Sequence, residues 1–181
     1  IVVEDGCTDN TPEIAHSLSE RFDNVQHLHF EDRLGKGGAI EEGFKAADAD
    51  ILGFMDADLS TDTKDFTKLV GEIEGGAELA VGSRYCDGSI SDRKISRAFY
   101  SRVYNRLASL VLGTGLKDHQ CGFKAVRATT FEQLSIIDKE WFWDTELVFR
   151  VKQRDGKIAE VPVNWISKAD SKVSIKTTGQ N

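Results

Sequence analysis

The apolar run Ile51–Met55 ends abruptly in two aspartates, Asp56 and Asp58, and this junction constrains the fold more than any other stretch. A short apolar run bounded by polar residues is typical of a buried strand. Open α/β sheets bind ligands just outside the carboxyl ends of their strands. Two carboxylates there suit a hard divalent cation, which binds through one or two carboxylates and the phosphates of a substrate. The alternative interpretation is a solvated turn with an Asx cap for the next helix.

Strand and helix patterns alternate along the chain. Strands are predicted at residues 1–3, 25–30, 51–55, 79–81, 123–126 and 158–163; helices are predicted at 12–22, 66–73, 95–112 and 145–151, and another runs to about residue 47 after a loop at 35–38. This alternation predicts an α/β domain with a mostly parallel central sheet and helices on both faces. We expect residues 1–181 to form one domain. Because the sequence opens inside a strand pattern, we expect this domain to lack its first strand, and it can continue beyond Asn181.

Composition excludes several classes of protein. The 181 residues are enough for one domain with a sizeable core. A net charge of −7 argues against a general nucleic-acid binder, since that function needs a basic face. Three widely spaced cysteines fit no metal-binding spacing and suggest reduced thiols in a cytosolic setting. No run of about 18 apolar residues is present, so the sequence predicts no membrane-spanning helix.

Two further clusters precede predicted helices. Glu4 and Asp5 follow the first strand, where a carboxylate can accept a hydrogen bond from a base or a ribose hydroxyl; the alternative is a plain strand-to-helix turn. The segment at 35–39 is glycine-rich but matches neither a P-loop nor the dinucleotide fingerprint. Its glycines could let the backbone approach a ligand, with Lys36 near a phosphate. Simple punctuation at a helix start is the slightly favoured alternative for the glycines.

The predicted helix Ile95–Leu112 is basic and amphipathic. Arg97, Ser101 and Asn105 share one face, and an arginine with a serine can hold a phosphate. The apolar side of the helix packs on a core or meets lipid. The alternative is a solvated surface helix, although Arg84 on the preceding loop favours a functional interpretation.

Two aspartates in the second half of the chain are candidate catalytic groups. Asp118 precedes the strand at 123–126, and Asp144 follows three aromatic residues at 141–143. Burial among aromatic rings would raise the pKa of a carboxylate and make it a general base. The alternative is a helix N-terminus that Asp144 caps.

Taken together and in order, these segments resemble the nucleotide-diphospho-sugar transferases of glycosyltransferase family 2. Within that family they look most like polyprenyl-phosphate sugar transferases of the dolichyl-phosphate glucosyltransferase kind, with dolichyl-phosphate mannose synthases slightly more distant. The resemblance covers essentially the whole chain. The matching segments are residues 3–9, 35–37, 56–58, 82–85, 118–124, 143–147, 160–165 and 171–173.

The resemblance implies the GT-A fold and an inverting transfer of a hexose, glucose before mannose, from UDP-glucose or GDP-mannose to a polyprenyl (dolichyl) phosphate. By resemblance, Asp56-Ala57-Asp58 is the DxD motif, in which Asp58 binds Mg²⁺ or Mn²⁺ and Asp56 contacts the ribose or the metal. The remaining implied contacts are Glu4, Asp5 and Lys36 for the nucleotide sugar, Arg84, Arg97 and Ser101 for the acceptor phosphate, and Asp118 and Asp144 near the reacting centre.

The resemblance also implies a place of action, the cytoplasmic side of a membrane, reached peripherally or through segments outside this chain. It leaves the oligomeric state open. One departure is Cys7, which replaces the usual serine after the glycine. Three alternatives stay open: a transferase of the same fold with a hydroxyl acceptor and Asp144 as base, a nucleotide-sugar binding module without turnover, and a nucleotidyltransferase.

Overall fold

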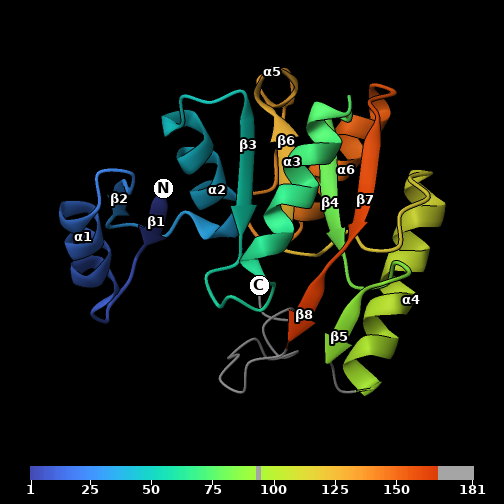
Figure 1. The fold of residues 1–181 in the computed structure, drawn as a ribbon, viewed down its shortest axis with the longest axis horizontal. Helices are drawn as coiled ribbons and strands as arrows, with labels where there is room; N and C mark the ends of the chain where they lie inside the picture. Colours follow the sequence, from blue (N-terminus) through green and yellow to red (C-terminus); the bar gives the residue numbers. More distant parts are fainter. Residues whose placement is uncertain (93–94, 167–181) are drawn as a thin grey trace.

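The computed structural model describes residues 1–92 and 95–166, and the side chains outside 91–99 (Figure 1). Eight strands and six α-helices are present over these residues. The strands are β1 (Val2–Asp5), β2 (His27–Phe30), β3 (Ile51–Met55), β4 (Leu79–Ser83), β5 (Ile90–Asp92), β6 (Phe123–Arg127), β7 (Ile158–Pro162) and β8 (Asn164–Ile166). The α-helices are α1 (Thr11–Arg21), α2 (Gly35–Ala46), α3 (Phe66–Glu74), α4 (Ile95–Leu112), α5 (Ala128–Phe131) and α6 (Trp143–Gln153), and a short 3₁₀ helix covers Thr63–Asp65.

The central sheet has the strand order β3-β6-β4-β7. β4 and β7 are parallel, and β6 runs antiparallel to both β3 and β4, so three of the four strands share one direction. β1 and β2 form a separate parallel pair, and β5 pairs with β8. Because β6 begins at the edge where β3 and β4 end, the residues before β6 join those that follow β3 and β4.

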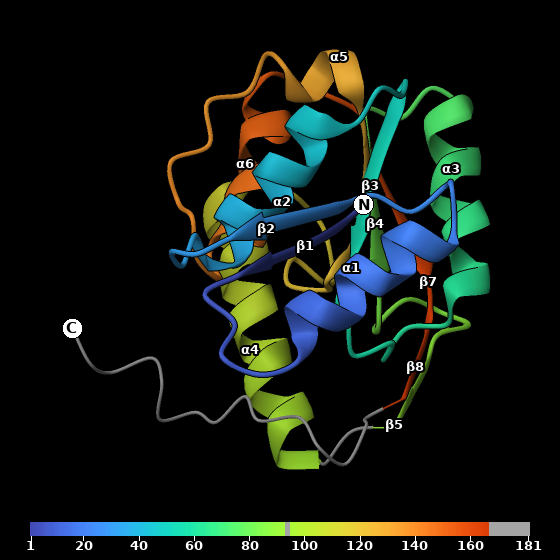
Figure 2. The same ribbon diagram turned by 90° about the vertical axis from the view of Figure 1, so that its left-hand side faces the viewer.

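Helices cover both faces of the central sheet (Figure 2). On one face, Leu69 and Ile73 of α3 pack on Phe123 and Ala125 of β6. On the other, the α6 side, Trp143 and Leu147 form a core with Leu79, Val81 and Val126. Successive residues of β4 and β6 therefore enter opposite cores, as the alternation of side chains along a strand requires.

The predicted fold class is confirmed: the domain is α/β with a sheet between helices. The predicted limits of the elements at 51–55 and 95–112 match β3 and α4. The predicted loop at 35–38 is wrong, because these residues form the first turn of α2. The reversed strand β6 and the break between β7 and β8 were not predicted, since both depend on pairing with distant strands.

No helix in the described part of the chain combines the length and the apolar character needed to cross a bilayer.

Candidate active site

The residues predicted to carry function gather at one edge of the central sheet. β3 and β4 end there, β6 begins there, and Asp56 donates its backbone N–H to the carbonyl of Gly122 over 3.0 Å. Lys36 of α2 and Asp144 of α6 also reach this edge. Ligands of open α/β sheets bind at such an edge, so we take it as the candidate active site.

The acidic pair after β3 is exposed on a constrained turn. The Asp56 side chain is 46% exposed, and Ala57 and Asp58 are exposed as well. Asp58 accepts the N–H of Ser60 over 2.9 Å and so forms an Asx turn, but the side chain that caps the following 3₁₀ helix is that of Asp62. Leu59 has a φ of 52°, a conformation that residues other than glycine seldom adopt and that clusters at functional sites. The turn fixes the backbone and leaves both carboxylates at the surface.

Gly122 determines where the Asp56 carboxylate can lie. A Cβ at this position would come within 2.0 Å of Asp56 Oδ2 and 2.2 Å of its Cγ. Atoms cannot approach so closely, so any larger residue at position 122 would displace the carboxylate.

Beside the acidic pair, two lysines and two aspartates form a mostly buried charge network. Lys36 Nζ lies 2.7 Å from Asp144 Oδ2 and 3.1 Å from Asp56 Oδ1. Lys124 is fully buried and donates to Asp144 and, over 2.6 Å, to the carbonyl of Cys121. The Lys36 ammonium also lies 5.1 Å from the ring centroid of Trp141. The two cations compensate both carboxylates and hold Lys36 next to Asp56.

The expectation that burial raises the pKa of Asp144 is wrong. Burial alone would raise it, but Lys124 and Lys36 outweigh that effect and lower the pKa of Asp144 below its usual value. For Lys36, burial would lower the pKa, yet Asp144 and Asp56 raise it. Asp144 is thus held ionised. A general base works best when its pKa is near the working pH, and a lowered carboxylate pKa lies further from neutral pH.

Asp118 is a fully buried partner of Arg84. Its carboxylate accepts Arg84 Nε over 2.6 Å and Arg84 Nη2 over 2.8 Å, and it also accepts the Arg84 backbone N–H over 3.1 Å. Burial by itself would lower the pKa of the Arg84 guanidinium. The bonds to Asp118 outweigh that effect and raise the pKa above its usual value, so Arg84 stays charged. Glu160 accepts the Asp118 backbone N–H over 2.8 Å. The pair orients a cation and leaves Asp118 without the freedom of a mobile base.

Helix α4 packs against this side of the site through polar contacts. Asn105 is buried and accepts the backbone N–H of His119 over 2.8 Å. Tyr104 lies 3.1 Å from the Thr145 hydroxyl of α6. Two guanidinium groups lie near the centroid of the Tyr85 ring, that of Arg84 at 5.8 Å and that of Arg102 at 5.4 Å.

The other residues predicted to hold the acceptor phosphate are on α4. Ser101 is half-buried, four residues before Asn105 on the same side of the helix. The Arg97 side chain lies outside the described residues. The predicted phosphate contacts from α4 therefore stay predictions.

Glu4 and Asp5, predicted to face the nucleotide, both have protein partners. Asp5 Oδ2 accepts the N–H groups of Leu34 and Gly35, over 2.6 and 2.9 Å, at the start of α2. Glu4 is buried, and its Oε1 lies 3.1 Å from His27 Nε2 and 2.5 Å from His29 Nδ1. Burial would raise the pKa of Glu4, but the bonds to His29 and His27 lower it. Both residues have structural contacts, and their contact with a nucleotide stays a prediction.

The glycines of the 35–38 segment bring α2 close to protein, not to an open cleft. Gly35 has a φ of +78°, and a Cβ there would lie 2.6 Å from the carbonyl oxygen of Lys139. A Cβ on Gly37 would lie 2.5 Å from the Trp143 ring. These glycines let α2 begin tightly against the segment that leads into α6, which favours the interpretation as helix-start residues.

Sequence reasoning assigned no function to Lys124, Trp141 or His119. Lys124 lies among the apolar residues Phe123, Ala125 and Val126 of β6, and a lysine in such a run is seldom fully buried without a charged partner. That pattern was the available signal. Its partner Asp144 is 20 residues away in sequence, so the pairing itself needed the structure.

The donor atoms at this edge fit a divalent metal ion. Asp56 and Asp58 supply exposed carboxylate oxygens, which Mg²⁺ and Mn²⁺ prefer. Among the described residues, no group of three or more His, Cys, Asp or Glu side chains could hold a metal alone. A metal here would need further oxygen ligands, and a bound diphosphate supplies them.

The chain is similar in sequence to known glycosyltransferases. The profile described as Glycosyl transferase family 2 matches residues 1–135. The chain is 45% identical to glycosyltransferase AglD of Haloferax volcanii over 97% of its length and 28% of that protein. It is 32% identical to dolichyl-phosphate beta-glucosyltransferase of Mus musculus, and 30% identical to polyprenol monophosphomannose synthase of Mycolicibacterium smegmatis. These two alignments cover 96% and 91% of the chain, and 57% and 65% of the relatives.

Solved structures are similar in fold. Glucosyl-3-phosphoglycerate synthase from Mycobacterium tuberculosis, in complex with UDP, has a TM-score of 0.71 at 22% identity. The same enzyme with Mn²⁺ and UDP-glucose gives 0.70. In these two comparisons 98% and 99% of the chain are covered, and 62% of the enzyme in each. The profile match over three quarters of the sequence and the shared fold lead to one conclusion: the chain belongs to glycosyl transferase family 2.

Proposed function

We propose that this chain is the catalytic domain of an inverting transferase that moves a hexose from a nucleoside diphosphate sugar to a polyprenyl phosphate. The observation that carries the proposal is the position of the exposed Asp56 and Asp58 beside the Lys36 network and next to the buried Arg84–Asp118 pair. The first group suits a diphosphate with its metal, and the second supplies a fixed cation for another phosphate.

The donor site would use Asp56, Asp58 and Lys36. A divalent cation, when bound, neutralises the diphosphate that leaves. Lys36 lies 3.1 Å from Asp56 and carries a compensated charge, so it can approach a phosphate at the same place. The likeness to an enzyme solved with UDP-glucose supports glucose as the first sugar to test, and the mannose-transferring relative supports GDP-mannose as the second.

The acceptor site would use Arg84, whose guanidinium Asp118 orients through two bonds. A phosphate monoester is largely ionised near neutral pH, since its second pKa is about 6, and it can attack the anomeric carbon without a base. Positioning is then the main requirement. This agrees with Asp118 and Asp144, because the carboxylates of both are held in ion pairs. The names of the dolichyl- and polyprenol-linked relatives support a polyprenyl phosphate as acceptor.

The experiment is a transfer assay with labelled UDP-glucose or GDP-mannose, dolichyl phosphate, and Mg²⁺ or Mn²⁺. We expect labelled lipid from one donor, its loss with a chelator, and its recovery when metal is restored. Asp58→Asn should remove the activity, and Asp48→Asn, an exposed aspartate on the loop before β3, is the matched control. Absence of labelled lipid with every donor and metal would refute the proposal.

A hydroxyl acceptor is the main rival, because it would need a general base. Under that hypothesis Asp144→Asn would abolish transfer to a glycan hydroxyl in protein that circular dichroism shows to be folded, and Arg84→Lys, which keeps a positive charge beside Asp118, would have little effect. The polyprenyl-phosphate proposal expects the Arg84 change to be severe. A binding module without catalytic activity would bind UDP, but it would not cleave a UDP-sugar to form UDP.

A further inference from the structure

Trp141 is a large aromatic residue that stays exposed at the edge of the candidate active site. It is 53% exposed and lies on the turn that leads into α6. The Lys36 ammonium lies 5.1 Å from the centroid of its ring and 3.1 Å from Asp56. Isolated apolar residues are common on protein surfaces and need no explanation. Trp141 differs from them because a single lysine contacts both its ring and the acidic pair.

Trp143 shows by contrast how a tryptophan of this segment serves the fold. It is fully buried, its ring centroid lies 5.5 Å from that of Phe54, and its indole N–H donates to Glu41 over 3.1 Å. Trp141 is a member of neither hydrophobic core that the described residues form. An exposed tryptophan offers a ligand both a broad apolar face and a polar N–H. The core does not need the Trp141 ring, so it is available to a ligand.

The backbone that carries Trp141 is held on both sides. The Gly38 N–H of α2 donates to the carbonyl of Lys139 over 3.0 Å. Glu146 of α6 accepts the backbone N–H of Asp138 over 2.8 Å. A ring that is presented from a fixed backbone loses little conformational freedom when a ligand binds, and such preorganisation favours affinity.

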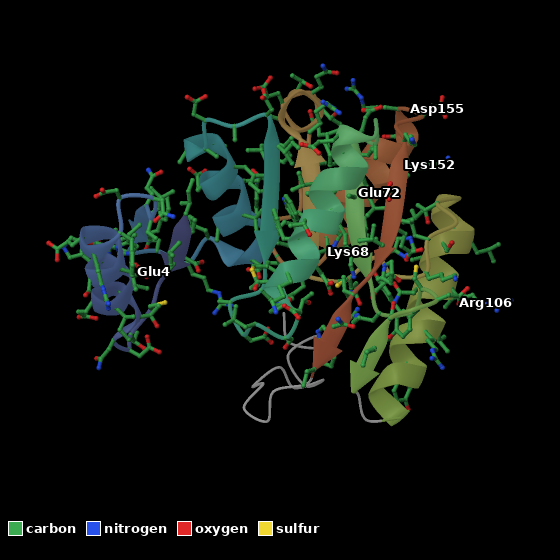
Figure 3. The ribbon with its side chains drawn as sticks, in the orientation of Figure 1. Glu4, Lys68, Glu72, Arg106, Lys152 and Asp155 are labelled. Carbon is green, nitrogen blue, oxygen red and sulfur yellow. The ribbon has the colours of Figure 1, made fainter. Side chains whose placement is uncertain are left out.

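The start of α6 lies between the donor side and the acceptor side of the site. Asp144 contacts Lys36 over 2.7 Å, whereas the hydroxyl of the adjacent Thr145 lies 3.1 Å from a tyrosine hydroxyl of α4. Figure 3 shows Lys152, near the other end of α6, toward the opposite edge of the sheet, so only the beginning of this helix belongs to the site. A sugar in transfer must lie between the donor phosphates and the acceptor. Trp141 directly precedes this part of α6 and is therefore beside the position expected for the sugar.

The chemistry of a hexose suits an indole ring. A pyranose carries its hydroxyl groups around the rim and C–H groups on its two faces, so one face can pack on a flat aromatic ring while the hydroxyls meet polar groups. Ligand sites commonly combine aromatic walls with a few polar groups in this way. Here Lys36 supplies N–H donors next to the ring, and Asp56 and Asp144 supply carboxylate oxygens.

We propose that Trp141 is the platform on which the hexose of the nucleotide sugar packs one face of its ring, so that this residue contributes to donor selection. The proposal rests on the proposed function and names a contact that only the sugar makes. A nucleoside diphosphate without its hexose lacks this contact. The Trp141 ring thus favours the intact donor over the nucleotide that remains after transfer, and this difference helps the product to leave.

The test is isothermal titration calorimetry without acceptor, with UDP-glucose and UDP in the presence of Mn²⁺, and with GDP-mannose and GDP in parallel. Trp141→Ala should weaken binding of the sugar-bearing donor by roughly tenfold, since the apolar contact with the sugar is lost. Binding of the free nucleoside diphosphate should be unchanged. Trp141→Phe keeps a flat ring and should recover most of the lost affinity. Equal weakening for UDP and UDP-glucose would overturn the assignment.

The matched control is Phe142→Ala. Phe142 is 51% exposed on the same turn, and the variant keeps its backbone carbonyl, which accepts the Glu146 N–H over 3.0 Å. We expect this variant to bind UDP-glucose as the unchanged chain does. Circular dichroism should show that Trp141→Ala and Phe142→Ala are both folded. The same loss in both variants would attribute the effect to the turn rather than to the Trp141 ring, and it would overturn the proposal.

Acrylamide quenching of tryptophan fluorescence gives a readout that a purely structural residue would not change. Trp143 is buried, so the exposed Trp141 should account for much of the quenching. UDP-glucose should protect this fluorescence and UDP should not, and Trp141→Phe should remove the protected part. Equal protection by UDP alone would assign the ring to the nucleoside and refute the proposal.

Transfer kinetics separate a failure of this inference from a failure of the proposed function. Trp141→Ala should raise the KM for the donor and leave the KM for polyprenyl phosphate unchanged. A rise for the acceptor alone would assign the ring to the acceptor and refute the proposal. If the unchanged chain transfers the sugar and the variant matches it, only the Trp141 assignment fails. If the unchanged chain binds no nucleotide sugar at all, the proposed function fails and the assignment fails with it.

Discussion

At the scale of single residues, the candidate site is built from charges that compensate one another. Asp144 forms ion pairs with Lys36 and Lys124, and Asp118 forms an ion pair with Arg84. A buried charge without a partner is costly, so each member depends on the others. The same pairing leaves Asp56, the more exposed acid of the network, as the group that can exchange Lys36 for a ligand.

Replacement of Asp144 by asparagine should therefore be costly. It leaves Lys124 buried without a counter-charge and should lower the free energy of unfolding by about 3–5 kcal/mol. The pKa of Asp144 is lowered in the folded state, so its stabilising contribution is present above the unfolded pKa and is lost as pH falls through the folded one. Urea unfolding from neutral to acidic pH should show a weaker pH dependence in Asp144→Asn than in the unchanged chain. An unaltered acid limb would contradict this account.

Gly122 offers a test of the position of the acidic pair. Gly122→Ala would place a Cβ within 2.0 Å of Asp56 Oδ2 and displace the carboxylate. A misplacement of this size should reduce transfer by roughly 100-fold. Gly71→Ala is the matched control, since a Cβ there meets nothing within 4 Å; in the interior of α3 it should stabilise the fold by about 0.5–1 kcal/mol. Equal activity of the two variants would contradict the close packing.

At the scale of elements, α2 is held at its start by a residue from a neighbouring strand. Its N-cap residue, Leu34, makes no side-chain capping bond, and Asp5 of β1 accepts the first N–H groups instead. A carboxylate at a helix N-terminus also interacts favourably with the helix dipole. This contact fixes the direction of α2 and with it the position of Lys36.

Asp5→Ala should consequently destabilise the domain by about 1–2 kcal/mol, in the range of a lost cap. Asp5→Asn keeps an oxygen acceptor and should recover most of that loss. Urea denaturation of the two variants measures the difference. If Asp5→Asn were as unstable as Asp5→Ala, the capping explanation would be wrong, and the negative charge itself would be the stabilising feature.

At the scale of the whole molecule, burial differs between the central sheet and the β1–β2 pair. All residues of β4 are buried, as are four of five in β6, whereas β1 has one buried residue and β2 has none. The β1–β2 pair lies at one end of the molecule with α1 (Figure 1). Stability is distributed accordingly, since segments with few buried contacts open more easily.

Hydrogen exchange should reveal this difference. The backbone amides of β4 and β6 should exchange most slowly, close to the rate set by global unfolding, and those of β1 and β2 should exchange earlier through local opening. Peptide-resolved mass spectrometry can measure both in one experiment. Equal protection of the central sheet and the β1–β2 pair would show that the molecule unfolds as one cooperative unit.

The sequence by itself determined the α/β class, the strand Ile51–Met55 with its acidic pair, and the limits of α4. These features are local: an apolar run, a helical period and a turn are encoded by adjacent residues. The order of the motifs was also enough to identify the family.

Only the tertiary structure decided what the charged residues contact. The sequence predicted Asp144 to be a base among aromatic rings, but in the structure it is paired with Lys36 and Lys124. Asp118 was likewise predicted to be a catalytic group, and in the structure it is paired with Arg84. The helical period shows that α4 has an apolar and a polar side, but only the structure shows that Asn105 is buried, where it accepts the N–H of His119, and that Leu107 and Leu110 are exposed. Such contacts join residues far apart in sequence, and the energy of a buried charge or an exposed apolar face is set by those neighbours.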